Sequence, residues 1–275
     1  MTYETDAPRR AEAQAEAASR SSAIEWFARA GLAARGLIYG IVGVLALELA
    51  LGEGGETTSQ QGALKEIAQQ PFGEALLIAT AIGLAGYATW RFVRAALGHG
   101  KETEDDTVER VGGVVSGVGY ALLCVAAIDI LIGSSGGSGG ASQTTGGVLS
   151  WPGGPWIVGV AGALTIGEGL HQGYKGIAKE FLEKSKTEQM SPGVESTFTK
   201  LGIFGHLARM VVFTLIGYFL LKAAIDYNPD AAVTLDGALA KLAQAAYGPL
   251  ALGVVAAGLL SFGLYSLADA RYRRV

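Results

Sequence analysis

The chain has 275 residues, of which 50% are hydrophobic and only 17% are charged, with a formal net charge of −4. A soluble protein carries about 25% charged residues, so this composition argues against a soluble domain and indicates an integral membrane protein that contacts the lipid bilayer. The charge balance, without a basic face, argues against nucleic-acid binding. Cys124 is the one cysteine, and no Cys/His cluster has metal-ligand spacing, so we expect no metal and no cofactor.

Six apolar runs are long enough to cross a bilayer as helices, a crossing that needs about 20 residues. These runs cover residues 28–51, 74–97, 111–132, 155–178, 201–224 and 248–269. Lysines and arginines gather before the first run, between the second and third, between the fourth and fifth, and after the sixth. Because positive residues mark the cytoplasmic side of a membrane protein, we expect both termini to be cytoplasmic.

Residues 1–24 precede the first run and are rich in Ala, Glu and Arg. They contain no apolar core and no small-residue cleavage site, so they do not have the pattern of a signal peptide. We expect a cytoplasmic tail that is disordered or loosely helical.

The sequence repeats itself at long range. The stretch GLAARGLIYGIVG at 31–43 recurs 174 residues later as GHLARMVVFTLIG, which places Arg35 and Arg209 at the same repeat position. A weaker middle copy keeps register 81 residues after the first and carries Ser116 in place of the arginine. Such self-similarity at a fixed spacing indicates three tandem copies of one unit.

Each copy contains two of the apolar runs, and the repeats span residues 25–100, 107–182 and 197–275. An even number of spans gives all repeats the same orientation, so an axis along the membrane normal relates them. The predicted fold is an all-α polytopic membrane protein with six transmembrane helices and pseudo-threefold symmetry. In the middle repeat, the Gly- and Ser-rich segment 133–147 is expected to be a flexible linker.

Several local motifs fit this architecture. They are GxxAR at 31–35, QGAL at 61–64, PFG at 71–73, GYxxW at 86–90, YKGxxxEFL at 174–182 and GLYSLADARYRR at 263–274. Together they resemble the bacterial DUF1206 family over residues 25–275. The resemblance implies six spans in three two-helix repeats and a location in the bacterial inner membrane. It implies no activity and no catalytic residues, because the function of that family is unknown.

Ionisable residues at membrane depth are costly and are usually paired or functional. Arg35 and Arg209 lie roughly 10 Å inside their helices, where they can partly snorkel to the headgroups. The fourth run carries four polar residues on one helical face within EGLHQGYK, namely Glu168, His171, Gln172 and Lys175. The repeat without an arginine therefore carries an acid, and we predict a buried polar network in which Glu168 pairs with Arg35, Arg209 or both.

Three roles for this network follow from its chemistry. It can fix helix register and packing, as a polar core residue does in a coiled coil. It can act as a proton or ion relay, with Glu168 titrating beside His171. The basic groups can instead bind lipid headgroups of the inner leaflet.

Small residues spaced by four mark close helix packing in membranes. The GxxxG pairs are Gly36 and Gly40, Gly113 and Gly117, and Gly169 and Gly173. We expect these glycines to pack repeat against repeat rather than copy against copy. A protein partner or a homo-oligomer is left open.

Enzyme motifs are missing, since the sequence has no G-x-S-x-G elbow, no H-E-x-x-H and no phosphate loop. The P-x-[DE]-x-x-[KR] signature of the mitochondrial carriers is also absent from the odd-numbered runs. We therefore expect a structural, interaction or stress-associated membrane protein and no enzyme. The alternative is a transporter or channel for a small solute, protons or ions that uses Glu168 and His171.

Overall fold

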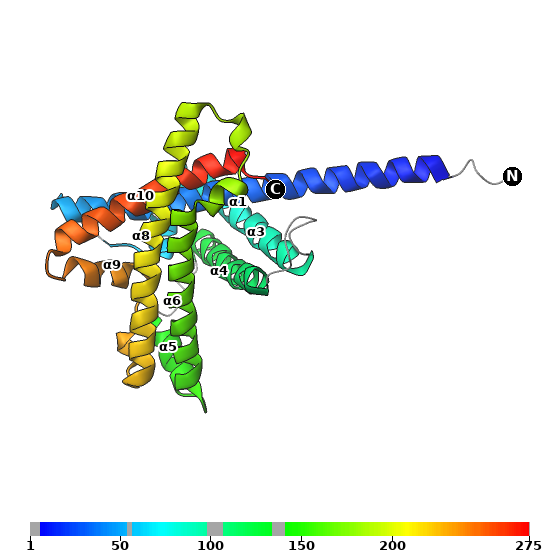
Figure 1. Cartoon of the computed structure of the whole chain (residues 1–275). Helices are drawn as coiled ribbons and strands as arrows, with labels where there is room; N and C mark the ends of the chain where they lie inside the picture. Colours follow the sequence, from blue (N-terminus) through cyan, green and yellow to red (C-terminus); the bar gives the residue numbers. More distant parts are fainter. Residues whose placement is uncertain (1–5, 54–56, 98–106, 134–140, 275) are drawn as a thin grey trace.

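The computed structural model describes residues 6–53, 57–97, 107–133 and 141–274, and its regular elements are all helices (Figure 1). The long helices are α1 (Asp6–Leu51), α3 (Gly73–Leu97), α4 (Thr107–Leu131), α6 (Gly154–Ala178), α8 (Pro192–Ile225) and α10 (Gly248–Tyr272). The short elements are α2 (Gln60–Gln69), α5 (Ala141–Leu149), α7 (Glu180–Glu183), η1 (Thr187–Gln189), η2 (Pro229–Ala231) and α9 (Leu235–Ala243). The prediction of an all-helical chain is confirmed.

Within the described residues, five helical stretches are long and apolar enough to cross a membrane. They are Ala28–Leu51, Gly73–Val93, Gly112–Leu131, Pro192–Ile225 and Gly248–Tyr272. Several such helices in one chain indicate a multi-pass membrane protein. The predicted run 155–178 also forms a long helix, α6, but it is not one of the five. Its C-terminal half is more polar because it carries Glu168, His171 and Lys175.

Helix α1 extends well beyond its membrane-length part. It is continuous from Asp6 and projects from the rest of the molecule toward the N-terminus (Figure 1). The tail that was expected to be disordered or loosely helical is therefore helical over residues 6–24. Of the segment 133–147, which was expected to be a flexible linker, residues 134–140 lie outside the described residues, and the chain is helical from Ala141, where α5 begins.

The long helices associate mainly between consecutive repeats. Helix α3 packs on α4, α6 on α8, and α10 on α1, so the last helix of the chain lies along the first (Figure 1). Within the first repeat α1 also packs on α3, and within the third α8 packs on α10. Helices α4 and α6 of the middle repeat do not pack closely on each other in the part of the chain that the structure describes.

Glycines bring the helix backbones together between repeats. A Cβ atom on Gly263 would lie 2.7 Å from the backbone N of Gly40, and one on Gly36 would lie 2.8 Å from the carbonyl oxygen of Gly263. On the α6–α8 pair, a Cβ on Gly217 would lie 2.6 Å from the carbonyl oxygen of Gly162. Any larger side chain would force these helices apart.

The six predicted packing glycines lie at these contacts. Gly36 faces α10, Gly113 and Gly117 face Ala95 and Phe92 of α3, and Gly169 and Gly173 face Thr214 and Met210 of α8. The Cβ position of Gly40 is itself open, although its backbone N approaches Gly263. The contacts join repeat to repeat within one chain.

A second set of glycines allows helices to cross inside the first and third repeats. Gly31 of α1 lies against Tyr87 of α3, and Gly205 of α8 occupies the same repeat position against Phe262 of α10. A Cβ on Gly205 would lie 2.6 Å from the Cα of Phe262. These crossings place Tyr87 and Phe262 in the core, where both are almost inaccessible.

The middle repeat lacks the corresponding crossing. Its residue at the position of Gly31 is Gly112, which has no atom within 4 Å of its Cβ position. Where the first and third repeats have Gly83 and Gly258, the middle repeat has Leu164, whose exposed fraction is 65%. A leucine cannot make the close backbone approach that a glycine allows, which explains why α4 and α6 stay apart.

Candidate functional site

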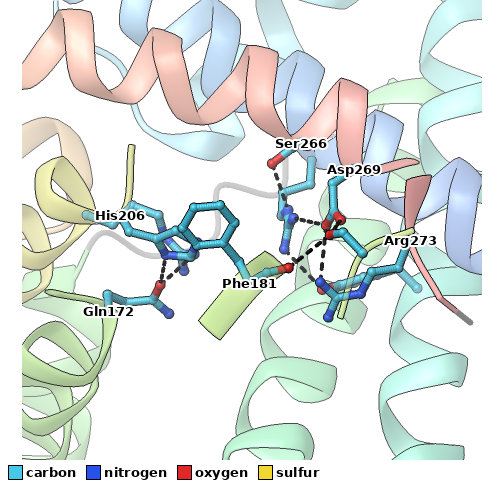
Figure 2. Close-up of polar contacts among 10 residues, drawn as sticks. Gln172, Phe181, His206, Ser266, Asp269 and Arg273 are labelled. Carbon is cyan, nitrogen blue, oxygen red and sulfur yellow. Dashed lines mark hydrogen bonds and ion pairs between the residues drawn. The ribbon is translucent and has the colours of Figure 1, made fainter. Parts of the chain in front are cut away.

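Arg35 lies in the core and forms a cluster with α3 and α10. Its Nη1 donates a hydrogen bond to the Tyr87 hydroxyl at 3.2 Å, and its Nε donates to the Ser266 hydroxyl at 3.2 Å. Its Nη2 lies 3.6 Å from Oδ2 of Asp269, whose side chain is inaccessible (Figure 2). The charge of Arg35 is therefore balanced by a carboxylate from the last helix of the chain.

Asp269 also holds the C-terminal end of α10. Nη1 of Arg273 lies 3.4 Å from the Asp269 carboxylate. The buried hydroxyl of Ser185 donates to the carbonyl of Phe181 at 2.9 Å and lies 3.5 Å from the same carboxylate. The connection after α7 is fixed to α10 by its backbone, because the N–H of Lys186 donates to the carbonyl of Tyr272 at 2.7 Å. One carboxylate thus joins α1, α10 and the segment between α6 and α8.

Arg209 has a different set of partners. Its Nη1 donates to Oε1 of Gln172 at 3.3 Å, and Nδ1 of His206 lies 2.7 Å from the same oxygen (Figure 2). Nε2 of Gln172 donates to Oε1 of Glu168 at 2.5 Å. The network around Arg209 therefore runs from α8 to α6 through one buried amide.

The two arginine environments correspond residue by residue. Ser266 and Gln172, which accept from Arg35 and Arg209, occupy the same position on the second helix of their repeats. One helical turn further on, the third repeat has Asp269 and the middle repeat has Lys175. Equivalent sites therefore have opposite charges.

The structure changes the predicted pairing of Glu168. Arg35 pairs with Asp269 because α10, rather than α6, lies against α1. Glu168 approaches Arg209 only through the amide of Gln172. Glu168 was predicted to pair with Arg35 because the two residues lie at a similar depth in the membrane. A contact also requires that their helices, α6 and α1, be neighbours.

The other predicted members remain on α6. His171 and Lys175 are half-buried on the face that carries Glu168. The histidine that joins the hydrogen-bond network is His206 of α8, which the sequence reasoning did not select. Ser266, Asp269 and Tyr87 were also missed as partners of Arg35, although all three lie in motifs quoted above.

Shared aromatic rings connect the arginines into one cluster. The guanidinium carbons of Arg91 and Arg35 lie 5.3 Å and 5.7 Å from the centroid of the Tyr87 ring. Those of Arg35 and Arg209 lie 5.1 Å and 4.5 Å from the centroid of the Phe262 ring. These distances allow cation–π attraction, which is strongest where the cation is desolvated.

The described residues contain no group of three or more His, Cys, Asp or Glu side chains that could hold a metal ion. Glu25 lies just before the membrane-length part of α1, and a hydrogen bond from Arg29, together with the charge of Arg29, holds the pKa of the Glu25 carboxyl below its usual value. Nothing in these arrangements points to catalysis.

The comparisons with known proteins agree with the repeat organisation. The family described as a Domain of Unknown Function (DUF1206) matches the chain three times in tandem, over residues 30–98, 111–179 and 204–273. The chain is 34% identical over 257 residues to the uncharacterized protein YxxB of Bacillus subtilis (strain 168), an alignment that covers 92% of each protein. No solved structure matches the chain. With three matches that together cover most of its length, the chain belongs to the DUF1206 family.

Proposed function

We propose that the chain spans the bacterial inner membrane six times, with its repeats arranged about a pseudo-threefold axis along the membrane normal. Support for the axis comes from equivalent contacts between repeats: Gly36 with Leu267, Gly117 with Phe92, and Met210 with Gly173. Helix α6 is the sixth span in this proposal. Its 25 residues extend about 38 Å, and it packs along α8.

The cytoplasmic location of both termini is part of the same proposal. The basic residues that flank the helices support this orientation, since it places the positively charged connections inside. The relative from Bacillus subtilis supports a bacterial membrane.

Within this architecture the chain acts as a structural or interaction protein of the membrane rather than as an enzyme. The observation that supports this function best is the buried contact of Arg35 with Asp269, which fastens the first helix to the last. A buried ion pair adds little net stability, but it can select one helix arrangement over others. A fixed arrangement of helices is what a membrane scaffold requires.

The network around Arg209 offers no proton path from Glu168 to His206. Glu168 and His206 are joined by Gln172, whose N–H faces the carboxylate and whose carbonyl faces the imidazole. A side-chain amide has no proton that it readily gives up, so it holds its neighbours in place without passing protons between them.

A flux measurement tests this proposal directly. The full chain and its Glu168→Gln variant are reconstituted into liposomes that contain a pH-sensitive dye, and an outward proton gradient is imposed. We expect both proteins to leak protons no faster than protein-free liposomes. A proton flux through the unmodified chain that Glu168→Gln abolishes would overturn the scaffold function and establish the relay.

A further inference from the structure

The surroundings of Arg209 lack the carboxylate that balances the charge of Arg35. Where Arg35 has the carboxylate of Asp269, the equivalent place beside Arg209 has the ammonium group of Lys175. The cations Arg91, Arg209 and Lys184 and the carboxylate of Glu168 are the charges that act on Lys175. The single negative charge of Glu168 can balance only one of these positive charges.

Two of these arginines have buried donors that find no acceptor. The Nε atoms of Arg91 and Arg209 are inaccessible and lack a hydrogen-bond partner among the described residues, as does Nε of Arg273 beside Asp269. The carbonyl oxygen of Gln172 already accepts from both Arg209 and His206. An unsatisfied buried donor costs about 1–3 kcal/mol, and more when it is charged, so an acceptor-rich group is expected at this place.

The site lies at the open side of the molecule. Phe262 and Asp269 in the third repeat are inaccessible, whereas Glu168 and Lys175 at the equivalent positions of the middle repeat are half-buried. The difference follows from the missing crossing at Leu164, which leaves α6 unpacked by α4. A small group can therefore approach Lys175 from this side.

The depth of Lys175 and Arg209 in the membrane indicates which kind of ligand can reach them. At 1.5 Å per residue, Lys175 lies about 31 Å from Gly154, where α6 begins, and Arg209 lies about 24 Å from Ile225, where α8 ends. The hydrocarbon core is about 30 Å thick. In the proposed topology, on which this step rests, Lys175 is therefore at the level where the lipid headgroups begin, and Arg209 lies about 6 Å deeper, a distance that its long side chain can span.

We propose that Arg209, Lys175 and Arg91 form a binding site for a phosphate group, which takes the place that the Asp269 carboxylate occupies beside Arg35. A tetrahedral anion offers several acceptor oxygens to the donors that α3, α6 and α8 carry, and guanidinium groups bind it with directed, charge-assisted hydrogen bonds. The phosphate belongs either to an anionic lipid headgroup or to a free phosphate ion. Basic pockets between membrane helices recognise lipid headgroups by the same chemistry.

Thermal unfolding of the full chain tests the site and separates the two sources. In the first arm, detergent-solubilised protein is titrated with inorganic phosphate against sodium chloride of equal ionic strength. In the second, the protein is placed in nanodiscs of phosphatidylcholine with and without phosphatidylglycerol. We expect the unfolding midpoint to rise by about 5 °C in at least one arm. A rise with phosphate identifies the free ion, and a rise only with phosphatidylglycerol identifies the lipid.

The Lys175→Asp variant gives the sharpest check, because it supplies Arg209 with the carboxylate that Arg35 already has. We expect this variant to fold, to unfold no earlier than the unmodified chain without ligand, and to lose the phosphate-dependent rise. Lys175→Gln should reduce the rise by an intermediate amount. Lys222→Gln is the matched control, since Lys222 is an exposed lysine that pairs with Asp226 at the other end of α8.

Two results would overturn the proposed site. One is a midpoint of the unmodified chain that neither phosphate nor phosphatidylglycerol raises. The other is a rise that Lys175→Asp retains or that Lys222→Gln loses to the same extent. Neither result bears on the scaffold function, which the flux measurement tests separately.

Discussion

Arg35 and Arg209 occupy the same position in two copies of one repeat, yet their surroundings differ in charge. Arg35 is enclosed by Tyr87, Ser266 and the inaccessible carboxylate of Asp269. Arg209 contacts the neutral amide of Gln172 next to Lys175 on a half-buried face of α6. The comparison indicates that duplication preserved the position of the cation, whereas the neighbouring helix determines whether that cation is neutralised.

Asp269→Asn should produce the largest effect. It leaves Arg35 and Arg273 buried beside a neutral amide, and removing one partner of a buried pair typically costs about 3–5 kcal/mol. Chemical unfolding of the detergent-solubilised protein measures this loss. Glu168→Gln is the matched change on α6, and we expect less than about 1 kcal/mol there because Glu168 is half-buried and contacts an uncharged donor. Equal losses in the two variants would contradict the difference between the two sites.

Gly205→Ala should give the second-largest effect. The new Cβ would lie 2.6 Å from the Cα of Phe262, so α8 and α10 would have to separate. Overpacking of this kind costs about 1–3 kcal/mol. The control is Gly112→Ala at the same position of the middle repeat, where no atom lies within 4 Å. We expect Gly112→Ala to be neutral or slightly stabilising in the same unfolding assay, because alanine favours a helix over glycine. Destabilisation by Gly112→Ala to the extent of Gly205→Ala would show that α4 and α6 do cross.

Hydropathy and internal repetition were sufficient to predict the long helices, the three repeats and the equivalence of Arg35 with Arg209. They were insufficient to identify Asp269 as the partner of Arg35, since that choice depends on α10 packing against α1 across almost the whole chain. The repeat alignment does equate Asp269 with Lys175, so the difference in charge was visible in the sequence. Only the structure relates this charge difference to Arg35 and Arg209, because an alignment does not say which helices are neighbours.

The open middle repeat had a sequence signal that went unused. Gly83 and Gly258 occupy one repeat position, and Leu164 occupies the corresponding position of the middle repeat.

The short helix α5 was not predicted, because its composition is typical of a linker. Its sequence contains two glycines and no charge, so composition favours a linker, whereas the structure buries Thr145 and Leu149 of this helix.

The ion pair of Arg274 with Glu188 should give the smallest effect and marks the contrast between surface and core. The two groups are 2.9 Å apart and both are exposed. A backbone hydrogen bond and then Arg274 hold the pKa of the Glu188 carboxyl below its usual value in the folded chain. A carboxyl with a lowered pKa stabilises the folded state above its unfolded pKa of about 4.3, and that contribution is lost as the pH falls through the lower folded value.

The Arg274→Ala variant should therefore lose only slightly less stability than the unmodified chain when the pH is lowered. High salt should make the two proteins still more alike, because exposed charges are screened. The unfolding midpoint measured from pH 6 to pH 3 at low and high salt checks this expectation. A large change that salt does not affect would mean that the pair is shielded from water in the membrane-bound protein. Glu188 would then belong, with Ser185, to the buried cluster around Asp269 rather than to the surface.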